Sequence, residues 1–216
     1  MAAMLASTPT DPPDSSRSSP DRANWRLGAN VPQTRGTLFR RFGYAMMRLL
    51  GWDFEGQMPN LSRFVVVVAP HTSNLDFFVG LFGKWALGLD VRFIAKSSLF
   101  VPPLGWFMRA IGGVPVVRTQ RNNLVEQSIH EFATREAFVL VLAPEGTRKR
   151  VTEWKSGFWH IARAARVPIC CVALDYGRKR IRLGPVVDAD DVDAATGVAR
   201  VRAQFAGVQG YDPSSQ

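Results

Sequence analysis

The sequence contains little cysteine and no long uninterrupted apolar run, and each shortage excludes a class of protein. Only Cys170 and Cys171 are cysteines among the 216 residues. They are adjacent within an apolar run, which predicts two buried thiols in a reducing, cytoplasmic-side compartment and excludes a disulfide framework. Lys84 and Arg109 interrupt the longest apolar stretches before the ~18 residues that a membrane-spanning helix needs. We therefore expect a protein that lies on a membrane without crossing it.

Histidine is also scarce, and the N-terminus lacks a convincing signal peptide. The three histidines, His71, His130 and His160, share no ligand spacing with the cysteines, so we expect neither a metal nor a cofactor. The apolar start is short, and Pro and Asp follow it soon. Residues 1–24 are rich in Pro, Ser, Thr and Asp, which predicts a disordered tail.

Positive charge, by contrast, is plentiful. Lys and Arg number 27 against 18 Asp and Glu, a net charge of +9. This balance favours an anionic partner such as a membrane, a phosphorylated substrate or nucleic acid. The basic residues are scattered and no nucleic-acid-binding module is recognisable, so nucleic acid is not an expected partner. Abundant Phe and Trp beside Arg are typical of interfacial surfaces.

Alternating apolar segments predict a single α/β domain over 60–207, with a largely parallel central sheet flanked by helices. Unbroken β-branched or aliphatic runs indicate strands buried on both faces. The predicted strands cover 64–69, 91–95, 114–118, 137–142, 168–174 and 180–183. The predicted helices cover 75–87, 99–111, 122–134, 157–166 and 190–206.

The range 37–52 predicts an N-terminal amphipathic helix. Its apolar residues recur at helical spacing, while three arginines lie off that stripe. A basic amphipathic helix of this kind is typical of a membrane surface, although the same stripe is also compatible with packing on the domain's own core. The stripe consists of Leu38, Phe42, Ala45, Met46 and Leu49, and the arginines are Arg40, Arg41 and Arg48.

The strand 64–69 ends abruptly in a polar turn, where sites form in α/β folds. His71 is expected in the turn, with Ser73 or Asn74 as helix N-cap and Asp76 in the first helical turn. In that geometry a carboxylate holds an imidazole in one tautomer, and the imidazole removes a proton from a substrate hydroxyl. The alternative is a capping His and Asp without chemistry.

A second polar turn, 144–148, follows the strand 137–142. Gly146 allows a ligand close to the backbone, Thr147 offers a hydroxyl, and Arg148 offers a forked cation suited to phosphate. We expect Glu145 to organise these cations. The alternative is a turn with solvated charges.

Taken in order, these motifs resemble the glycerolipid acyltransferase family, which includes the 1-acyl-sn-glycerol-3-phosphate acyltransferases (PlsC-type lysophospholipid acyltransferases). His71 and Asp76 match the family's catalytic dyad. Two further blocks match its acceptor-binding blocks, and a fourth carries a proline at a strand start. The matching residues are Gly113, Val114, Pro115 and Arg118, then Glu145, Gly146, Thr147 and Arg148, then Val167, Pro168 and Ile169, with Lys96, Lys155 and Gly157 recurring between blocks.

The resemblance covers 64–185 and departs from the family pattern in three places, of which the loose match of the fourth block is one. Pro70 stands where many members have Asn, and one short helix stands in for a longer membrane module. Asn74 and Lys96 are assigned supporting roles by the resemblance. Five aromatic residues are candidates for an acyl groove, although most are expected in the core. They are Phe77, Phe78, Phe100, Trp106 and Phe107.

The resemblance implies an O-acyltransferase that moves a fatty acyl group from acyl-CoA or acyl carrier protein to lysophosphatidic acid. His71 would act as base, Asp76 would support it, and Arg118 and Arg148 would hold the acceptor phosphate. Backbone N–H groups near the dyad turn are candidates for oxyanion donors. The expected location is the cytoplasmic face of the cell membrane, peripheral or monotopic. Alternatives are another lyso-lipid acceptor, such as lyso-ornithine lipid, or a non-catalytic lipid-binding protein of the same fold.

Overall fold

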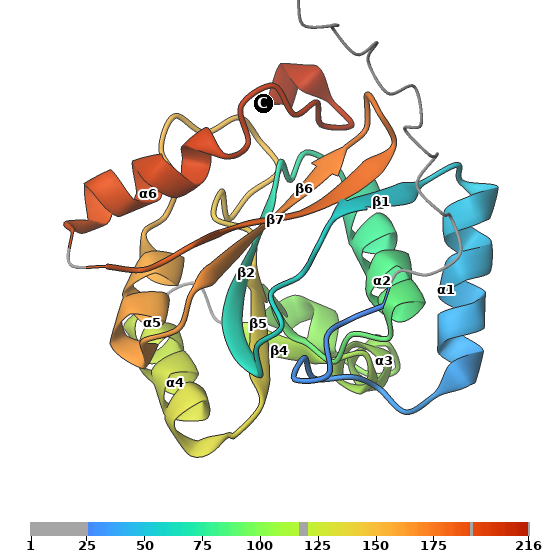
Figure 1. Cartoon of the computed structure of the whole chain (residues 1–216), viewed down its shortest axis with the longest axis horizontal. Coiled ribbons are helices and arrows are strands. Elements are labelled where there is room, and N and C mark those ends of the chain that lie inside the picture. The colour runs from blue at the N-terminus through green and yellow to red at the C-terminus, as the bar shows by residue number, and fades with distance from the viewer. Residues whose placement is uncertain (1–25, 117–120, 191, 216) are drawn as a thin grey trace, which may run out of the picture.

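The computed structural model describes residues 26–116, 121–190 and 192–215, in which the strands form one sheet of order β1-β7-β6-β2-β5-β3-β4. Strands β6, β2, β5, β3 and β4 run parallel to one another, and β7 and β1 run in the opposite direction (Figure 1). The predicted α/β fold with a largely parallel sheet is confirmed. The strands are β1 (Asp53–Gly56), β2 (Arg63–Ala69), β3 (Arg92–Lys96), β4 (Gly113–Val116), β5 (Phe138–Leu142), β6 (Ile169–Asp175) and β7 (Arg180–Val187).

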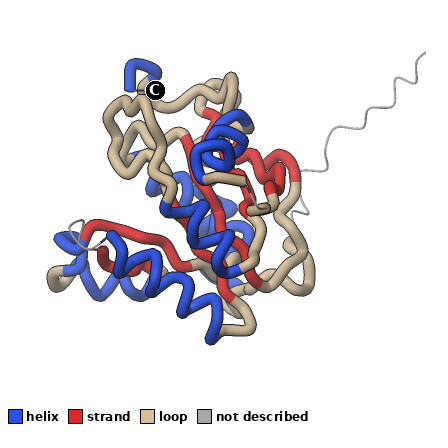
Figure 2. Tube along the Cα trace, turned by 90° about the vertical axis from the view of Figure 1, so that its left-hand side faces the viewer, coloured by secondary structure: helices blue, strands red, loops and turns tan. Residues whose placement is uncertain are grey.

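Helices cover both faces of the sheet. In Figure 1, α1, α2 and α3 lie on one side of the strands, and α4, α5 and α6 lie on the other. Figure 2 turns the second side toward the viewer and shows helices in front of the strands. The α-helices are α1 (Thr37–Leu49), α2 (Leu75–Leu87), α3 (Leu104–Ala110), α4 (Arg121–Thr134), α5 (Gly157–Ala165) and α6 (Ala194–Ala203), with short 3₁₀ helices η1 (Ser97–Phe100) and η2 (Pro213–Ser215).

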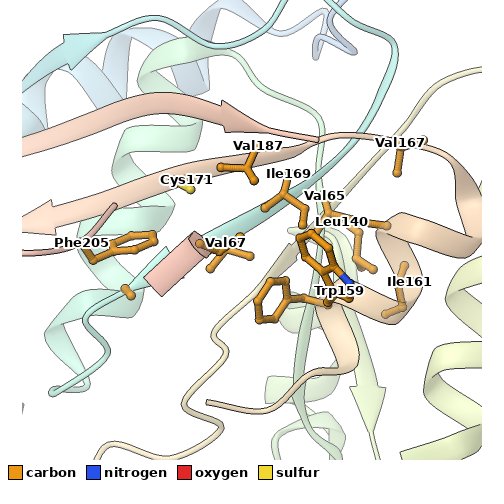
Figure 3. Close-up of a cluster of buried hydrophobic side chains, with 14 of the residues drawn as sticks. Val65, Val67, Leu140, Trp159, Ile161, Val167, Ile169, Cys171, Val187 and Phe205 are labelled. Atoms are coloured by element: carbon orange, nitrogen blue, oxygen red, sulfur yellow. The ribbon is translucent and has the colours of Figure 1, made fainter. Parts of the chain in front are cut away.

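Each central strand contributes side chains to two cores, one on each face of the sheet, because successive side chains of a strand point to opposite sides. Ile169 and Cys171 of β6 pack with the fully buried Trp159 of α5 (Figure 3). Cys170 and Val172 belong to the core under α1 and α2. The two cysteines are buried and free, as predicted, and the alternation directs their thiols to different cores.

Three elements differ from the predictions, and two of them differ for a local reason. The single helix over 99–111 is wrong: Pro102 and Pro103 supply no backbone N–H, so η1 ends before them and α3 begins after them. The closing helix begins at Ala194 because the carboxylate of Asp193 caps it, accepting from Thr196 N at 2.9 Å. Strand β1 was not predicted. The predicted tail 1–24 and the end of the strand 114–118 lie outside the described residues.

Helix α1 packs on α2 through the face that carries Gly43, and most of the apolar stripe predicted from the sequence is exposed to solvent. Gly43 and Met47 are buried against the domain, whereas Leu38, Phe42 and Leu49 are exposed. A Cβ added at Gly43 would lie 2.5 Å from the backbone nitrogen of Ala86, so the two helix backbones are in direct contact. In the part of the chain that the structure describes, no helix has the length and apolarity required to cross a bilayer.

Gly43→Ala is expected to lower the free energy of unfolding by about 1–3 kcal/mol through overpacking, because backbone atoms cannot move aside as side chains do. Gly80→Ala in α2 is the matched control, since an added Cβ there meets nothing within 4 Å. That substitution should stabilise the protein by about 0.5–1 kcal/mol through helix propensity. Urea unfolding followed by circular dichroism measures both, and equal midpoints would contradict the close helix contact.

Candidate active site

The two polar turns lie together because β2 and β5 are neighbouring parallel strands. The chain leaves β2 into α2 on one face of the sheet, and leaves β5 toward α5 on the other (Figure 1). In α/β proteins, ligands bind at the carboxyl ends of the strands where the connections change face in this way. A hydrogen bond joins the turns directly: the backbone N–H of His71 donates to Oε2 of Glu145 at 2.8 Å.

His71 and Asp76 form the pair that the sequence predicts. Nδ1 of His71 lies 3.2 Å from Oδ2 of Asp76, and the side chains are 23% and 1% exposed, respectively. The same Oδ2 accepts from the backbone nitrogens of Thr72 at 2.7 Å and Ser73 at 2.8 Å. Asn74 is the N-cap residue of α2 and its side chain is exposed. The imidazole is therefore partly exposed, with Nδ1 against the buried carboxylate and Nε2 left for a substrate.

Asp76 remains ionised despite its burial. Burial alone raises the pKa of this carboxyl, but the hydrogen bonds from His71, from the Ser73 backbone and from Tyr176 outweigh it and hold the pKa below its ordinary value. A buried anion beside Nδ1 stabilises an imidazolium and leaves Nε2 as the nitrogen that accepts a proton. The pair therefore has the geometry and charge of a general base.

Glu145 contacts the dyad turn through the His71 backbone, and the cation that acts on its carboxylate is Arg202. Among the described residues no ion pair joins Glu145 to Arg148, Lys149 or Arg150, so the expectation that Glu145 organises these cations stays a prediction. Burial raises the pKa of Glu145, and the negative charge of Asp76 adds to that effect, while the His71 backbone hydrogen bond opposes it. The backbone N–H groups of His71, Thr72 and Ser73 already donate to these two carboxylates. These three groups are therefore occupied, and the expectation that nearby backbone N–H groups serve as oxyanion donors does not extend to them.

The remaining predicted residues lie at the carboxyl edge of the sheet, where Lys96, Arg148 and Lys155 form what we call the basic rim. Gly146 adopts a positive φ of +64°, and the amine of Lys155 lies against it. The hydroxyl of Thr147 accepts from the backbone nitrogen of Lys149, and Arg148 is exposed. Lys96, also exposed, ends β3 at the same edge of the sheet. Arg118 lies outside the described residues.

Tyr176 is a site residue that was not predicted from the sequence. It directly follows β6, and its hydroxyl donates to Oδ1 of Asp76 at 2.8 Å. Tyr176 and Asp76 are 100 positions apart, so no local pattern connects them. The usable signal was its position, because it is a polar residue at the carboxyl end of the strand next to β2.

This fold and site define an α/β protein with a His–Asp dyad and a basic rim at the carboxyl edge of its sheet. The model of the Acyltransferase family matches residues 53–175. The chain belongs to this family, which confirms the resemblance drawn from its motifs.

Individual relatives agree with the family match. The chain is 32% identical over 130 residues to the chloroplastic 1-acyl-sn-glycerol-3-phosphate acyltransferase BAT2 of Brassica napus, covering 56% of this chain and 36% of that protein. It is 31% identical over 146 residues to the Saccharomyces cerevisiae 1-acyl-sn-glycerol-3-phosphate acyltransferase, covering 62% and 47%. The chain thus spans less than half the length of these relatives. The crystal structure of the Thermotoga maritima 1-acyl-sn-glycerophosphate acyltransferase, PlsC, shares the fold, with a TM-score of 0.52, 22% identity and 80% of each chain covered.

Proposed function

We propose that this chain transfers a fatty acyl group from acyl-CoA or acyl carrier protein to the free hydroxyl of lysophosphatidic acid, forming phosphatidic acid. The observation that carries the proposal is the dyad itself, a partly exposed imidazole against a buried carboxylate that accepts three further hydrogen bonds. The names of the relatives in Brassica napus and yeast support the choice of acceptor.

The reaction needs one group that accepts a proton and later returns it. Nε2 of His71 removes the proton from the acceptor hydroxyl as its oxygen attacks the thioester carbonyl. The tetrahedral intermediate then collapses, the carbon–sulfur bond breaks, and the thiolate takes the proton from His71. Asp76 keeps the ring oriented and stabilises its charged form throughout. The residues therefore supply acid–base chemistry without a cofactor.

The basic rim is suited to the acceptor's phosphate. Arg148 offers a planar fork for phosphate oxygens, and Lys96 and Lys155 add positive charge at the same edge of the sheet. Arg118 is assigned to the same phosphate by its motif. Gly146 and Thr147 shape the turn that carries Arg148.

The apolar side of the molecule supports a location on a membrane surface. Contrary to expectation, three of the five aromatic candidates are exposed, and Phe100 alone among them is buried. Helix α1 contains three arginines and no acidic residue. Apolar side chains insert at the boundary of the acyl chains of a bilayer, and arginines beside them are attracted by its anionic headgroups. We therefore propose peripheral or monotopic binding at the cytoplasmic face of the membrane. The exposed residues are Leu38, Phe39, Phe42 and Leu49 of α1, Leu75 and Phe78 of α2, and Leu99, Val101, Leu104, Trp106 and Phe107 of the η1–α3 region.

The direct test measures product formation by purified protein on lipid vesicles. Acyl-CoA and acyl carrier protein are each offered with lysophosphatidic acid, with lyso-ornithine lipid and with monoacylglycerol. We expect phosphatidic acid to form fastest, and monoacylglycerol to react at least about tenfold more slowly because it lacks the phosphate that a charged hydrogen bond would hold. Thin-layer chromatography of labelled products gives the rates.

Each other outcome points to a named alternative. Faster acylation of lyso-ornithine lipid would show that this lipid, and not lysophosphatidic acid, is the preferred acceptor. Equal rates with monoacylglycerol would overturn the phosphate site. Vesicle binding without any product, from every donor and acceptor pair, would favour a non-catalytic lipid-binding protein.

A further inference from the structure

Tyr176 is the one side chain from outside the dyad turn whose hydrogen bond to the Asp76 carboxylate is seen among the described residues. The two carboxylate oxygens face different partners. Oδ2 faces the His71 ring and takes the N–H groups of Thr72 and Ser73, whereas Oδ1 takes the hydroxyl of Tyr176 at 2.8 Å. A donor on Oδ1 fixes the rotation of the carboxylate about its Cβ–Cγ bond, and with it the direction in which Oδ2 points.

Tyr176 is itself held on three sides. Its ring lies edge-on to Trp52, with centroids 4.8 Å apart, and to Tyr211, with centroids 5.4 Å apart. Its backbone N–H donates to the carbonyl of Gln209 at 2.8 Å. The same C-terminal segment reaches the dyad turn, because the backbone nitrogen of Asp212 donates to the Thr72 hydroxyl at 3.2 Å. These ring and backbone contacts therefore fix the position of the Tyr176 hydroxyl.

We propose that Tyr176 is a positioning residue for the dyad, which orients the Asp76 carboxylate so that Oδ2 faces His71. The proposal rests on the acyltransferase function given above. Nothing in the motifs of the resemblance assigns this role, and the contact comes from a strand that carries neither polar turn.

The neighbouring charges explain why such a donor matters. Asp76 and Glu145 are two carboxyl groups at one turn, and Arg202 also acts on Glu145. Two nearby carboxylates disfavour double ionisation, so their environments decide which one keeps the charge. Tyr176 donates to Asp76, which lowers the pKa of Asp76 and favours the anion beside His71. Burial and this hydrogen bond raise the pKa of Tyr176, so its hydroxyl stays protonated and acts as a donor.

Tyr176→Phe tests the proposal, with Tyr211→Phe as the matched control. Phenylalanine keeps the ring contacts at 176 and removes the hydroxyl, while the control removes a hydroxyl from the exposed neighbouring ring. We expect Tyr176→Phe to lower kcat about 10- to 100-fold, the range for a hydrogen bond to a charged group, with KM for lysophosphatidic acid changed by less than about twofold. Its acid limb of kcat should move to higher pH, because Asp76 becomes easier to protonate. Tyr211→Phe should resemble the wild type.

A second readout does not depend on activity. The titration of the Asp76 carboxyl carbon, followed by ¹³C NMR, should have its midpoint at higher pH in Tyr176→Phe than in the wild type. An unchanged midpoint would overturn the proposal whether or not the protein is active. Equal loss of kcat in both variants with an unmoved pH profile would also overturn it, since a general packing role predicts that pattern. A wild type that acylates no acceptor would refute the proposed function, and the NMR titration would still decide the role of Tyr176.

Discussion

His71→Ala is expected to lower kcat for phosphatidic acid formation by about 10²- to 10⁴-fold, the usual contribution of a general base. The alcohol of a lysolipid is a weak nucleophile until its proton is removed, and Nε2 of the partly exposed His71 is the proposed proton acceptor. KM should change little, because the substitution leaves the basic rim, proposed to hold the phosphate, intact. Steady-state rates on vesicles measure both constants.

Asp76→Asn is expected to act through the same step. Asparagine keeps the size of the side chain but removes the charge that supports an imidazolium. Because the two residues act as a unit, the double variant should be about as slow as His71→Ala alone. His160→Ala, which changes an exposed histidine on α5, is the control and should keep full activity. Additive losses in the double variant, or a fully active His71→Ala, would contradict the dyad mechanism.

The second large effect is expected on membrane binding. Leu49 and Trp106 are 78% and 70% exposed, so their replacement disturbs little packing in the domain. We expect the double variant Leu49→Glu, Trp106→Glu to bind anionic vesicles at least about 10³-fold more weakly. Burial of such side chains contributes about 1.5–3 kcal/mol each, and charges near anionic lipid contribute about 1 kcal/mol each. Sedimentation with phosphatidylglycerol-containing vesicles measures the partition.

A matched control places the same charges at the opposite edge of the sheet. Leu61 precedes β2, and Val186 pairs with the start of β6; both are exposed apolar residues at the amino ends of the parallel strands. Leu61→Glu with Val186→Glu should therefore bind vesicles nearly as the wild type does. High salt should weaken wild-type binding through screening of arginines such as Arg41 and Arg109. Equal loss in both double variants, or complete binding that salt does not change, would refute this orientation or its electrostatic part.

The sequence predicts those parts of the fold whose cause is local. Strands β2, β5 and β6 are long apolar runs because both of their faces are buried, so their composition alone identifies them. β1 has four residues and one buried side chain, and it becomes a strand through pairing with β7. That pairing joins positions more than 120 residues apart, which no periodicity along the chain can reveal.

The candidate site divides in the same way. The positions of His71 and Asp76 follow from a five-residue spacing across a strand–turn–helix, and the spacing is local. The bonds of Glu145 to the His71 backbone and of Tyr176 to Asp76 span 74 and 100 positions. They depend on which strands become neighbours, a property of the folded sheet. The sequence therefore predicts the dyad, whereas it predicted Glu145 in a different role and did not predict Tyr176.

The backbone contact at Gly43 has a consequence for how the enzyme would meet its substrate. Helix α1 carries the exposed stripe, α2 carries Asp76, and the two helices touch without intervening side chains at Gly43. We therefore expect α1 and α2 to move together. If a bilayer holds α1 at a given depth in its headgroup layer, as proposed, it would also set the height of His71 above the acyl chains. Among lysolipids with similar headgroups, the protein would then prefer those whose free hydroxyl lies at the depth of His71 in the bilayer.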